Sequence, residues 1–316
     1  MLRGLPMPVD VDKIVVVKRK TTLEELLQRH ATSSQVKFFV ESRGQSYEWY
    51  QQQHEQYHRG LAQALSALPR TIRTQAIGKE ELPTYQFSEK DLVVVVGDDG
   101  LLVNAAKYVK GLSVISVNPD PDSFDGVLAS CSSLTFAGLL KKTLQNEAVA
   151  QALTMVEARL EDGQSLYALN DLFIGKSSHA SARYILEYDG KKERQSSSGI
   201  IVSSGTGSTG WLTSVMVGAQ ALTAAKALPA EFKDFSRESP YLQFVVREPF
   251  PSKITGTTLV SGHVTTTKYL NISSNMAEKG VIFGDGIESD YLEFNAGRTV
   301  TIKPAEQKVY LVSETK

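Results

Sequence analysis

Residues 92–106 read LVVVVGDDGLLVNAA, and in this stretch five apolar residues run directly into the turn Gly97-Asp98-Asp99-Gly100. An unbroken run of valines is typical of a strand buried on both faces of a parallel sheet. In open α/β sheets ligands bind beyond the carboxyl ends of the strands, so the turn is a candidate site. Its glycines let backbone N–H groups face a phosphate, and its carboxylates can act as a base or hold Mg²⁺. The alternative is an ordinary turn, because glycine and aspartate are common turn residues.

The segments around this stretch alternate between strand and helix patterns up to about residue 150. This order predicts an open parallel sheet with helices on both faces. The expected strands are 12–20, 71–78, 91–97 and 112–118, and the expected helices are 46–68, 101–111 (closed by Gly111) and 133–153.

Beyond about residue 150, short apolar runs separated by polar turns predict antiparallel β-structure. The step Asp189-Gly190 is expected to form a hairpin tip. The predicted fold class is α/β plus all-β. An N-terminal open parallel α/β domain is expected over 1–145 and a C-terminal antiparallel β domain over 146–316. In this prediction the last strand of the second domain can return to the first domain. The expected strands are 154–162, 164–175, 181–205, 241–250, 257–275, 279–286 and 290–313, and one helix is expected at 211–228.

The composition narrows the classes of function. The 316 residues carry a net charge of -1, which gives no electrostatic case for nucleic acid or an anionic membrane as partner. No apolar run has the length of a signal peptide or a membrane span, so a cytoplasmic protein is expected. Cys131, the single cysteine, excludes an intrachain disulfide and is expected to be a small buried apolar residue. His179 and His263 have no metal-ligand spacing and are expected to be surface or strand histidines, so no residue is assigned as a metal ligand.

Two further segments have polar groups suited to a nucleotide. Residues 203–211, SSGTGSTGW, form a small-residue loop whose N–H groups and hydroxyls can hold phosphate or sugar, or alternatively a flexible loop with a helix cap. It lacks the Gly-Lys-Ser/Thr of a Walker loop. The pair Asn170-Asp171 offers an amide and a carboxylate that can bind a nucleoside, the alternative being an ordinary turn.

The order and spacing of these three segments resemble the NAD kinase family, in particular its mitochondrial type and bacterial relatives. That family has a Gly-Gly-Asp-Gly-Thr signature after a parallel strand, then an Asn-Glu pair and a Thr-Gly-Ser-Thr-Ala-Tyr loop. This chain reads Gly97-Asp98-Asp99-Gly100-Leu101, Asn170-Asp171 and Thr206-Gly207-Ser208-Thr209-Gly210-Trp211. The segments 116–126, 168–208 and 280–286 add to the resemblance, which covers about residues 90–290.

The resemblance implies an active site between the two domains and transfer of the ATP γ-phosphoryl group to the 2′-hydroxyl of the NAD adenosine ribose, giving NADP. It also implies Mg²⁺ and a homodimer. Two alternatives remain. One is a diverged homologue that binds a dinucleotide without catalysis, which Asp98 and Leu101 favour because the family has glycine and threonine there. The other is a lipid or sugar kinase of the same superfamily, against which Asn170-Asp171 and the loop 203–211 argue.

The resemblance also implies roles for individual residues. Asp99 would be the catalytic carboxylate at the acceptor hydroxyl, as base or orienting group. Gly97, Asp98 and Gly100 would face the ATP phosphates, with Mg²⁺ offsetting the charge of Asp98, unless Asp98 only caps the following helix. The remaining residues implied in nucleotide binding are Asn118, Asn170, Asp171, Thr206, Ser208, Thr209, Gly210, Trp211 and Ser214, of which Thr209, Gly210, Trp211 and Ser214 would line the adenosine pocket.

Overall fold

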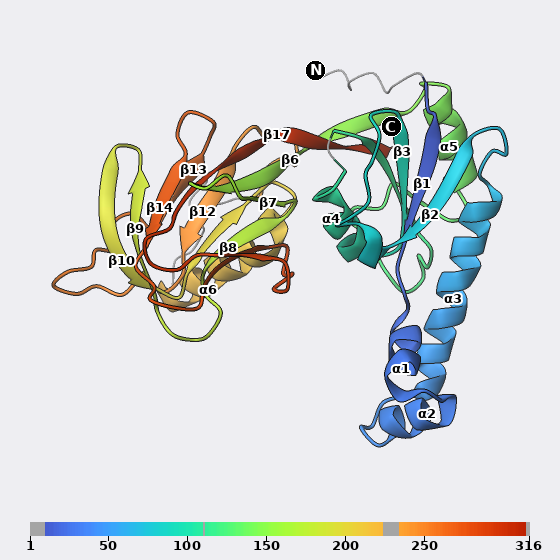
Figure 1. Cartoon of the computed structure of the whole chain (residues 1–316), viewed down its shortest axis with the longest axis horizontal. Helices are drawn as coiled ribbons and strands as arrows, with labels where there is room; N and C mark the ends of the chain where they lie inside the picture. The colour runs from blue at the N-terminus through green and yellow to red at the C-terminus, as the bar shows by residue number, and fades with distance from the viewer. Residues whose placement is uncertain (1–9, 110, 224–233, 314–316) are drawn as a thin grey trace. The chain divides into compact units, whose positions relative to one another are not determined.

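The computed structural model describes residues 10–109, 111–223 and 234–313, and it divides the chain into two compact units. Unit 1 comprises Met1–Gln151 and Val309–Lys316, and unit 2 is the continuous segment Ala152–Lys308. Figure 1 shows the helices α1 to α5 with the parallel strands of unit 1, and the antiparallel strands with helix α6 of unit 2. In the residues that the structure describes, no helix combines the length and apolar composition needed to span a membrane.

Unit 1 is built on parallel strands in the order β2-β1-β3-β4. The central strand β3 buries all six of its residues, as its run of valines predicts. The edge of β4 is covered by two short parallel pairings, with β5 at one end and with the last residues of β17 at the other. The bounds are β1 Lys13–Lys18, β2 Arg73–Gly78, β3 Asp91–Val96, β4 Ser113–Asn118, β5 Cys131–Ser132 and β17 Thr299–Ser313.

The helices of unit 1 fall into two groups. Helices α3 (Tyr47–Ser66), α4 (Asp99–Ala106) and α5 (Phe136–Leu144) follow the strands, and side chains of α3 and α5 pack into the core of the sheet. Helices α1 (Thr22–His30) and α2 (Ser33–Glu41) have a separate small core and lie beside the first half of α3 (Figure 1). Sequence patterns did not predict α1 and α2. A 3-10 turn, η1, spans Lys79–Glu81.

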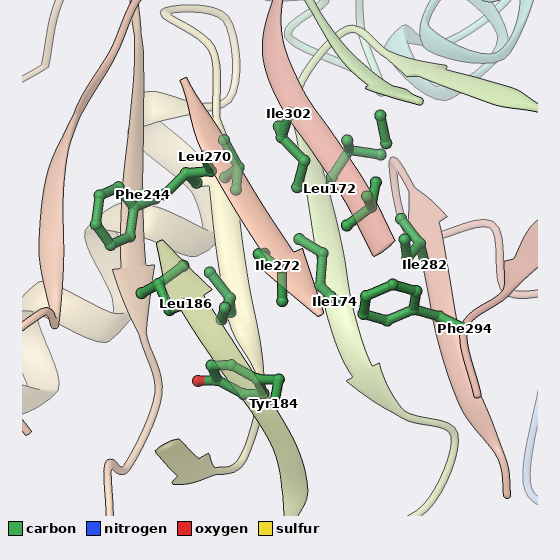
Figure 2. Close-up of a cluster of buried hydrophobic side chains, with 14 of the residues drawn as sticks. Leu172, Ile174, Tyr184, Leu186, Phe244, Leu270, Ile272, Ile282, Phe294 and Ile302 are labelled. Carbon is green, nitrogen blue, oxygen red and sulfur yellow. The ribbon is translucent and has the colours of Figure 1, made fainter. Parts of the chain in front are cut away.

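Unit 2 consists of two antiparallel sheets. One has the order β10-β9-β14-β17, with β6 paired to β17 and β7 paired to β6, and the other has the order β13-β12-β11-β8-β15-β16. Alternate apolar side chains of both sheets form one core (Figure 2), which explains the alternating burial of strands such as β9. The bounds are β6 Val149–Leu160, β7 Ser165–Ala168, β8 Asp171–Lys176, β9 Ala182–Tyr188, β10 Lys191–Ser197, β11 Ile200–Ser203, η2 Ser208–Leu212, α6 Thr213–Thr223, β12 Leu242–Val246, β13 Ser261–Val264, β14 Leu270–Ser274, β15 Gly280–Gly284 and β16 Tyr291–Glu293.

The predicted fold class, α/β followed by antiparallel β, is confirmed. The hairpin tip at Asp189-Gly190 is also confirmed, and both residues have positive φ. Cys131 is half-buried and packs against the core of unit 1. His179 is an exposed loop residue and His263 lies in β13, as expected.

Some element boundaries were predicted wrongly. The helix expected over 133–153 ends at Leu144, because Asn146 adopts φ 60 and the chain then enters β6 at Val149. The strand expected over 164–175 is two strands, β7 and β8, separated at Leu169 and Asn170.

Two helix predictions also need correction. Helix α4 ends at Ala106, well before Gly111, which has a φ of 72. The helix expected over 211–228 begins earlier, with the π-helical turn η2, and continues as α6 to Thr223. Its expected last residues, 224–228, lie outside the described residues.

Candidate functional site

The turn after β3 is shaped by packing and by a helix cap. A Cβ at position 97 would lie 2.8 Å from Leu101 Cδ2, the end of a flexible side chain, so a larger residue here would require the Leu101 side chain to shift. Asp98 is the N-cap of α4, with φ -80 and ψ 172, and its Oδ1 accepts a hydrogen bond of 3.0 Å from Leu101 N. Neither Gly97 nor Gly100 has positive φ. Local packing and capping therefore determine the conformation of this turn.

The negative charge of Asp98 has a protein partner. Its Oδ2 lies 3.2 Å from Nε of Arg19 in an ion pair that lacks hydrogen-bond geometry. Arg19 is held in place through its backbone N–H, which donates to the Tyr57 hydroxyl at 3.0 Å, and that hydroxyl donates to Val96 O at 3.2 Å. The arrangement is the capping alternative, in which the carboxylate of Asp98 neutralises Arg19 and the helix end.

Asp99 occupies the first turn of α4 and is half-buried. Its Oδ1 accepts a hydrogen bond of 3.1 Å from Leu128 N, the one contact that the described residues give this carboxylate. The N–H groups at a helix N-terminus stabilise a negative charge. Asp99 is thus a positioned carboxylate whose second oxygen is available to a ligand.

Asn118, at the end of β4, organises the loop that follows. Its Oδ1 accepts from Asp120 N at 2.9 Å and its Nδ2 donates to Phe124 O at 2.7 Å. Asp98, Asn118 and Asp120 line a small cavity of about 80 Å³. Asp120 is only 4% exposed, and within the described part of the chain its Oδ2 has no hydrogen-bond partner. A buried, unpartnered carboxylate oxygen is suited to a cation such as Mg²⁺.

In unit 2 the residues Asn170 and Asp171 are fixed by Asp285. Asp285 accepts backbone hydrogen bonds from Leu169 N at 3.0 Å, Asn170 N at 2.7 Å and Asp171 N at 3.3 Å. Its own N–H donates to Asp171 O at 2.9 Å. Asp285 has φ 59 in the turn after β15, a conformation that aspartate tolerates better than most residues. Asp285 was not among the predicted site residues. The sequence signal for its turn is the dipeptide Asp285-Gly286, at the end of the segment 280–286.

The carboxyl group of Asp171 is in an unfavourable place for a charge. Burial, with the nearby negative charge of Asp285 as a second cause, raises its pKa to about 7. The side chain is 9% exposed. Strongly raised carboxyl pKa values concentrate at functional sites, where a ligand supplies the missing partner.

The loop 203–211 packs directly onto Asn170. Ser204 N donates to Asn170 O at 2.8 Å, and a Cβ at Gly207 would lie 2.4 Å from the same oxygen. Inside the loop, Ser204 Oγ accepts from Thr206 N at 3.0 Å and Ser208 Oγ donates to Gly205 O at 2.9 Å. The loop is therefore held by hydrogen bonds within itself and to Asn170.

The end of the loop presents an aromatic surface. The Trp211 ring is stacked on Phe173, with centroids 5.7 Å apart and planes at 16°, and the Arg247 guanidinium lies 5.4 Å from the Trp211 centroid. These three residues, with Lys176 and Lys279, line a cavity of about 640 Å³. The other implied adenosine-pocket residues are exposed: Thr209, Gly210 and Ser214, whose Oγ donates to Gly210 O at 3.2 Å.

The structure thus gathers the predicted site residues into two groups. Unit 1 holds Gly97, Asp98, Asp99, Gly100 and Asn118, and unit 2 holds Asn170, Asp171, Thr206, Ser208, Thr209, Gly210, Trp211 and Ser214.

Comparisons with known proteins identify the relatives of this chain. It is 26% identical over 317 residues to NAD kinase 2, mitochondrial, of Rattus norvegicus, covering 76% of this chain and 74% of that protein. It is 26% identical over 251 residues to the NAD kinase of Chlorobaculum tepidum, covering 78% and 80%. This chain is a relative of the NAD kinases. No protein-family model matches it.

Solved NAD kinase structures share the fold. Yeast NADH kinase complexed with NADH superposes with a TM-score of 0.59 at 14% identity, covering 98% of this chain and 84% of that one. An NAD kinase from Archaeoglobus fulgidus in complex with ATP gives a TM-score of 0.53 at 18% identity, covering 96% and 93%. The parallel unit and the antiparallel unit described above are therefore the fold of NAD kinases.

Proposed function

We propose that this protein is an ATP-dependent NAD kinase, which transfers the γ-phosphoryl group of ATP to the 2′-hydroxyl of the NAD adenosine ribose and forms NADP. The observation that carries the proposal is Asp99, a half-buried carboxylate in the first turn of α4, just beyond the carboxyl end of β3. The relationship to NAD kinases over about three quarters of the chain supports the same activity.

Asp99 accepts the proton of the 2′-hydroxyl, or orients that hydroxyl, while the phosphoryl group is transferred. Its hydrogen bond from Leu128 N holds the carboxylate in one position, as a general base requires. Gly97, Gly100 and the N-terminal N–H groups of α4 face the ATP phosphates. Asp120, a buried carboxylate of unit 1 with an oxygen that has no hydrogen-bond partner among the described residues, would hold Mg²⁺, which would supply positive charge against the ATP phosphates.

NAD is recognised by the second group of residues. Asp171 accepts hydrogen bonds from ribose hydroxyls, and Asn170 offers its amide, both held in place by Asp285. The loop supplies Thr206 and Ser208. The adenosine is bound by Thr209, Gly210, Ser214 and the Trp211 ring, a face suited to stacking.

The assembly and location are part of the proposal. The protein acts as a homodimer in the cytoplasm. Helix α6 exposes Val217 and Leu222, at 53% and 90%. Light scattering after size-exclusion chromatography tests the dimer: a mass near 69 kDa, twice the 34.6 kDa chain, is expected.

The decisive experiment is a coupled assay for NADP formation by the purified full chain with ATP, Mg²⁺ and NAD. Parallel reactions replace NAD by NADH, by a diacylglycerol or by a hexose, and follow ATP consumption. NADP or NADPH formation is expected. Calorimetric binding of NAD without any NADP would instead indicate a non-catalytic homologue, and ATP consumption only with lipid or sugar would indicate a different kinase. Either result would refute the proposed activity.

A further inference from the structure

The helices α1 and α3 bring together side chains that the proposed reaction does not use. Among the residues that the structure describes, one group of three side chains of metal-ligating types is found: Glu24, His54 and His58. Each offers one ligand atom, and these atoms all lie within 4.8 Å of one another. The group belongs entirely to unit 1.

Local geometry explains why the three side chains meet. His54 and His58 are four residues apart on α3, so both rings lie on one face of the helix, with centroids 4.4 Å apart. Glu24 is in the first turn of α1, which packs against α3. His58 Nε2 and Glu24 Oε1 are 3.2 Å apart. Ligands about 2.0–2.1 Å from a tetrahedral zinc ion are themselves roughly 3.3 Å apart, so this pair already has the required separation.

Thr21 contacts two further polar atoms of the group, His54 Nδ1 and Glu24 Oε2. Its hydroxyl lies 2.9 Å from Nδ1 of His54, which orients that ring. Its backbone N–H donates to Glu24 Oε2 at 2.7 Å, as part of the capping box of α1. Secondary hydrogen bonds that orient the ligands are a regular feature of protein metal sites.

The charge of the group suits a cation. A glutamate carboxyl is ionised at neutral pH, so Glu24 supplies a negative charge to a cation. The side chains of His58 and Glu24 are 42% and 33% exposed, so an ion can reach them from solvent.

We propose that Glu24, His54 and His58 form a zinc-binding site that fastens α1 to α3, with solvent as the fourth ligand. Two imidazole nitrogens and one carboxylate are a ligand set that Zn²⁺ favours in proteins. The sequence also has the matching signature: residues 54–58 read HEQYH, the His-Glu-x-x-His pattern of helices that bind zinc through their two histidines.

The position of the site gives it a structural consequence. Thr21, which orients two of the ligands, is two residues beyond Arg19, the partner of Asp98. Zinc would therefore immobilise the connection between β1 and α1 from which Arg19 reaches the turn after β3. The zinc-site proposal does not depend on the proposed kinase activity.

The test is a zinc titration of the metal-stripped full chain against a chromophoric chelator, with the bound metal counted by mass spectrometry. One zinc ion per chain is expected. His54→Gln and His58→Gln should each weaken zinc binding at least 100-fold, since they remove a ligand and orienting partners alone are worth about 10- to 100-fold. Glu24→Gln, which keeps an acceptor for Thr21 N, should weaken it at least 10-fold. His179→Gln, which changes an exposed loop histidine of unit 2, should bind zinc as the unaltered protein does.

Cobalt provides a second measurement, one that reports the coordination geometry of the bound ion. Co²⁺ added to the unaltered protein should give the intense visible absorption bands of four-coordinate cobalt, and His58→Gln should lose them while keeping its circular dichroism spectrum. Zinc binding that is equally tight in the double variant H54Q/H58Q, or a cobalt spectrum unchanged by it, would overturn the proposal. So would the absence of zinc binding by the unaltered chain.

Discussion

Two pairs of aspartates, one in each unit, have opposite electrostatic surroundings. At the turn after β3, Asp98 and Asp99 lie at the N-terminus of α4. Arg19 forms an ion pair with the carboxylate of Asp98, and backbone N–H groups donate hydrogen bonds to both carboxylates. In unit 2, Asp171 is buried near Asp285, and its pKa is raised to about 7.

The difference teaches that neighbouring carboxylates do not by themselves indicate a strained site. A helix N-terminus and a cation stabilise the ionised carboxylates of the first pair in the absence of ligand. Burial and a like charge destabilise the ionised form of Asp171 until a ligand supplies hydrogen-bond donors. Asp285 in turn receives three backbone N–H groups. The variants below test this contrast.

The largest effect is expected for Asp285→Ala. It removes acceptors for three backbone N–H groups, each worth about 1.5–3 kcal/mol to a charged partner, while relieving the repulsion on Asp171. A net loss of about 4 kcal/mol in the free energy of unfolding is expected, measured by urea denaturation at pH 7. Asp285→Asn keeps one acceptor oxygen and should lose less. Equal stability of Asp285→Ala and the unaltered protein would show that the turn 169–171 does not depend on this residue.

Asp171→Asn should stabilise the protein at pH 8. The folded pKa is about 7 and the unfolded value about 4, so between these pH values the folded state holds a proton that the unfolded state has lost. Raising the pH from 4 to 7 therefore lowers the stability of the unaltered protein, by up to about 4 kcal/mol. Asn removes this slope, so a gain of about 2–4 kcal/mol is expected at pH 8 and almost none at pH 4.

Asp162→Asn is the matched control in unit 2. The hydrogen bond from Gln164 N, together with the contact to Arg298, holds the pKa of Asp162 below its usual value. Its contribution to stability is therefore present at neutral pH and lost as the pH falls below about 4, so the substitution has the opposite sign. Thermal melts from pH 4 to 8 distinguish the two variants; parallel curves would reject a raised pKa for Asp171.

The same residue should matter for substrate. Asp171→Ala is expected to weaken NAD binding by about 1.5–3 kcal/mol, the value of a lost charge-assisted hydrogen bond, and to affect ATP binding less. Calorimetry with each nucleotide separately measures both. An unchanged NAD affinity would remove Asp171 from the binding site.

Asp99→Asn should lower kcat at least about 100-fold, equivalent to about 2.7 kcal/mol of activation free energy, and leave NAD binding intact. The amide keeps an acceptor for Leu128 N but is no base. Asp122→Asn, an exposed aspartate of the same unit, is the control and should keep full activity. Wild-type kcat in Asp99→Asn would exclude it as the catalytic carboxylate.

The smallest effect is expected for Asp98→Gly, a loss of about 0.5–1 kcal/mol in stability from the weaker cap and the lost ion pair with Arg19. Asp98→Asn keeps the cap and isolates the ion pair. Titrations of Mg²⁺ against ATP should superimpose for all three proteins. A lower KM for ATP in Asp98→Gly would mean that Asp98 faces the donor phosphates after all.

The sequence predicted those parts of the fold whose patterns are local and strong. The valines of β3 and the helix α3 are examples, because burial on both faces and a regular apolar spacing leave few alternatives. Helices α1 and α2 were not predicted, since they are short and bury only a small core of their own around Leu23 and Val36. The helix expected to 153 failed because one residue, Asn146, in the left-handed region outweighs a favourable composition.

The candidate-site residues that the sequence could predict are those that a local sequence pattern marks. Asp99 was singled out by its position after an apolar segment, and Asp171 by its place in the Asn-Asp pair and by the resemblance to the NAD kinases. Asp285 was not, because its role depends on β15 pairing with β8, which places position 285 beside 169–171 across more than a hundred residues of chain. Arg19 was missed for the same reason: only the folded chain brings it to Asp98.

The return of the chain to β4 has a consequence for how the protein is made. Unit 2 is a continuous segment inserted in the sequence of unit 1, and Tyr310 and Leu311 supply β4 with its neighbour beside Ser113 and Val114. A ribosome delivers all of unit 2 before these residues emerge. Unit 2 can therefore fold while synthesis continues. The parallel sheet of unit 1 is incomplete during that time, because half of the edge of β4 has no neighbouring strand, and exposed strand edges promote aggregation. The nascent chain is most vulnerable in this interval.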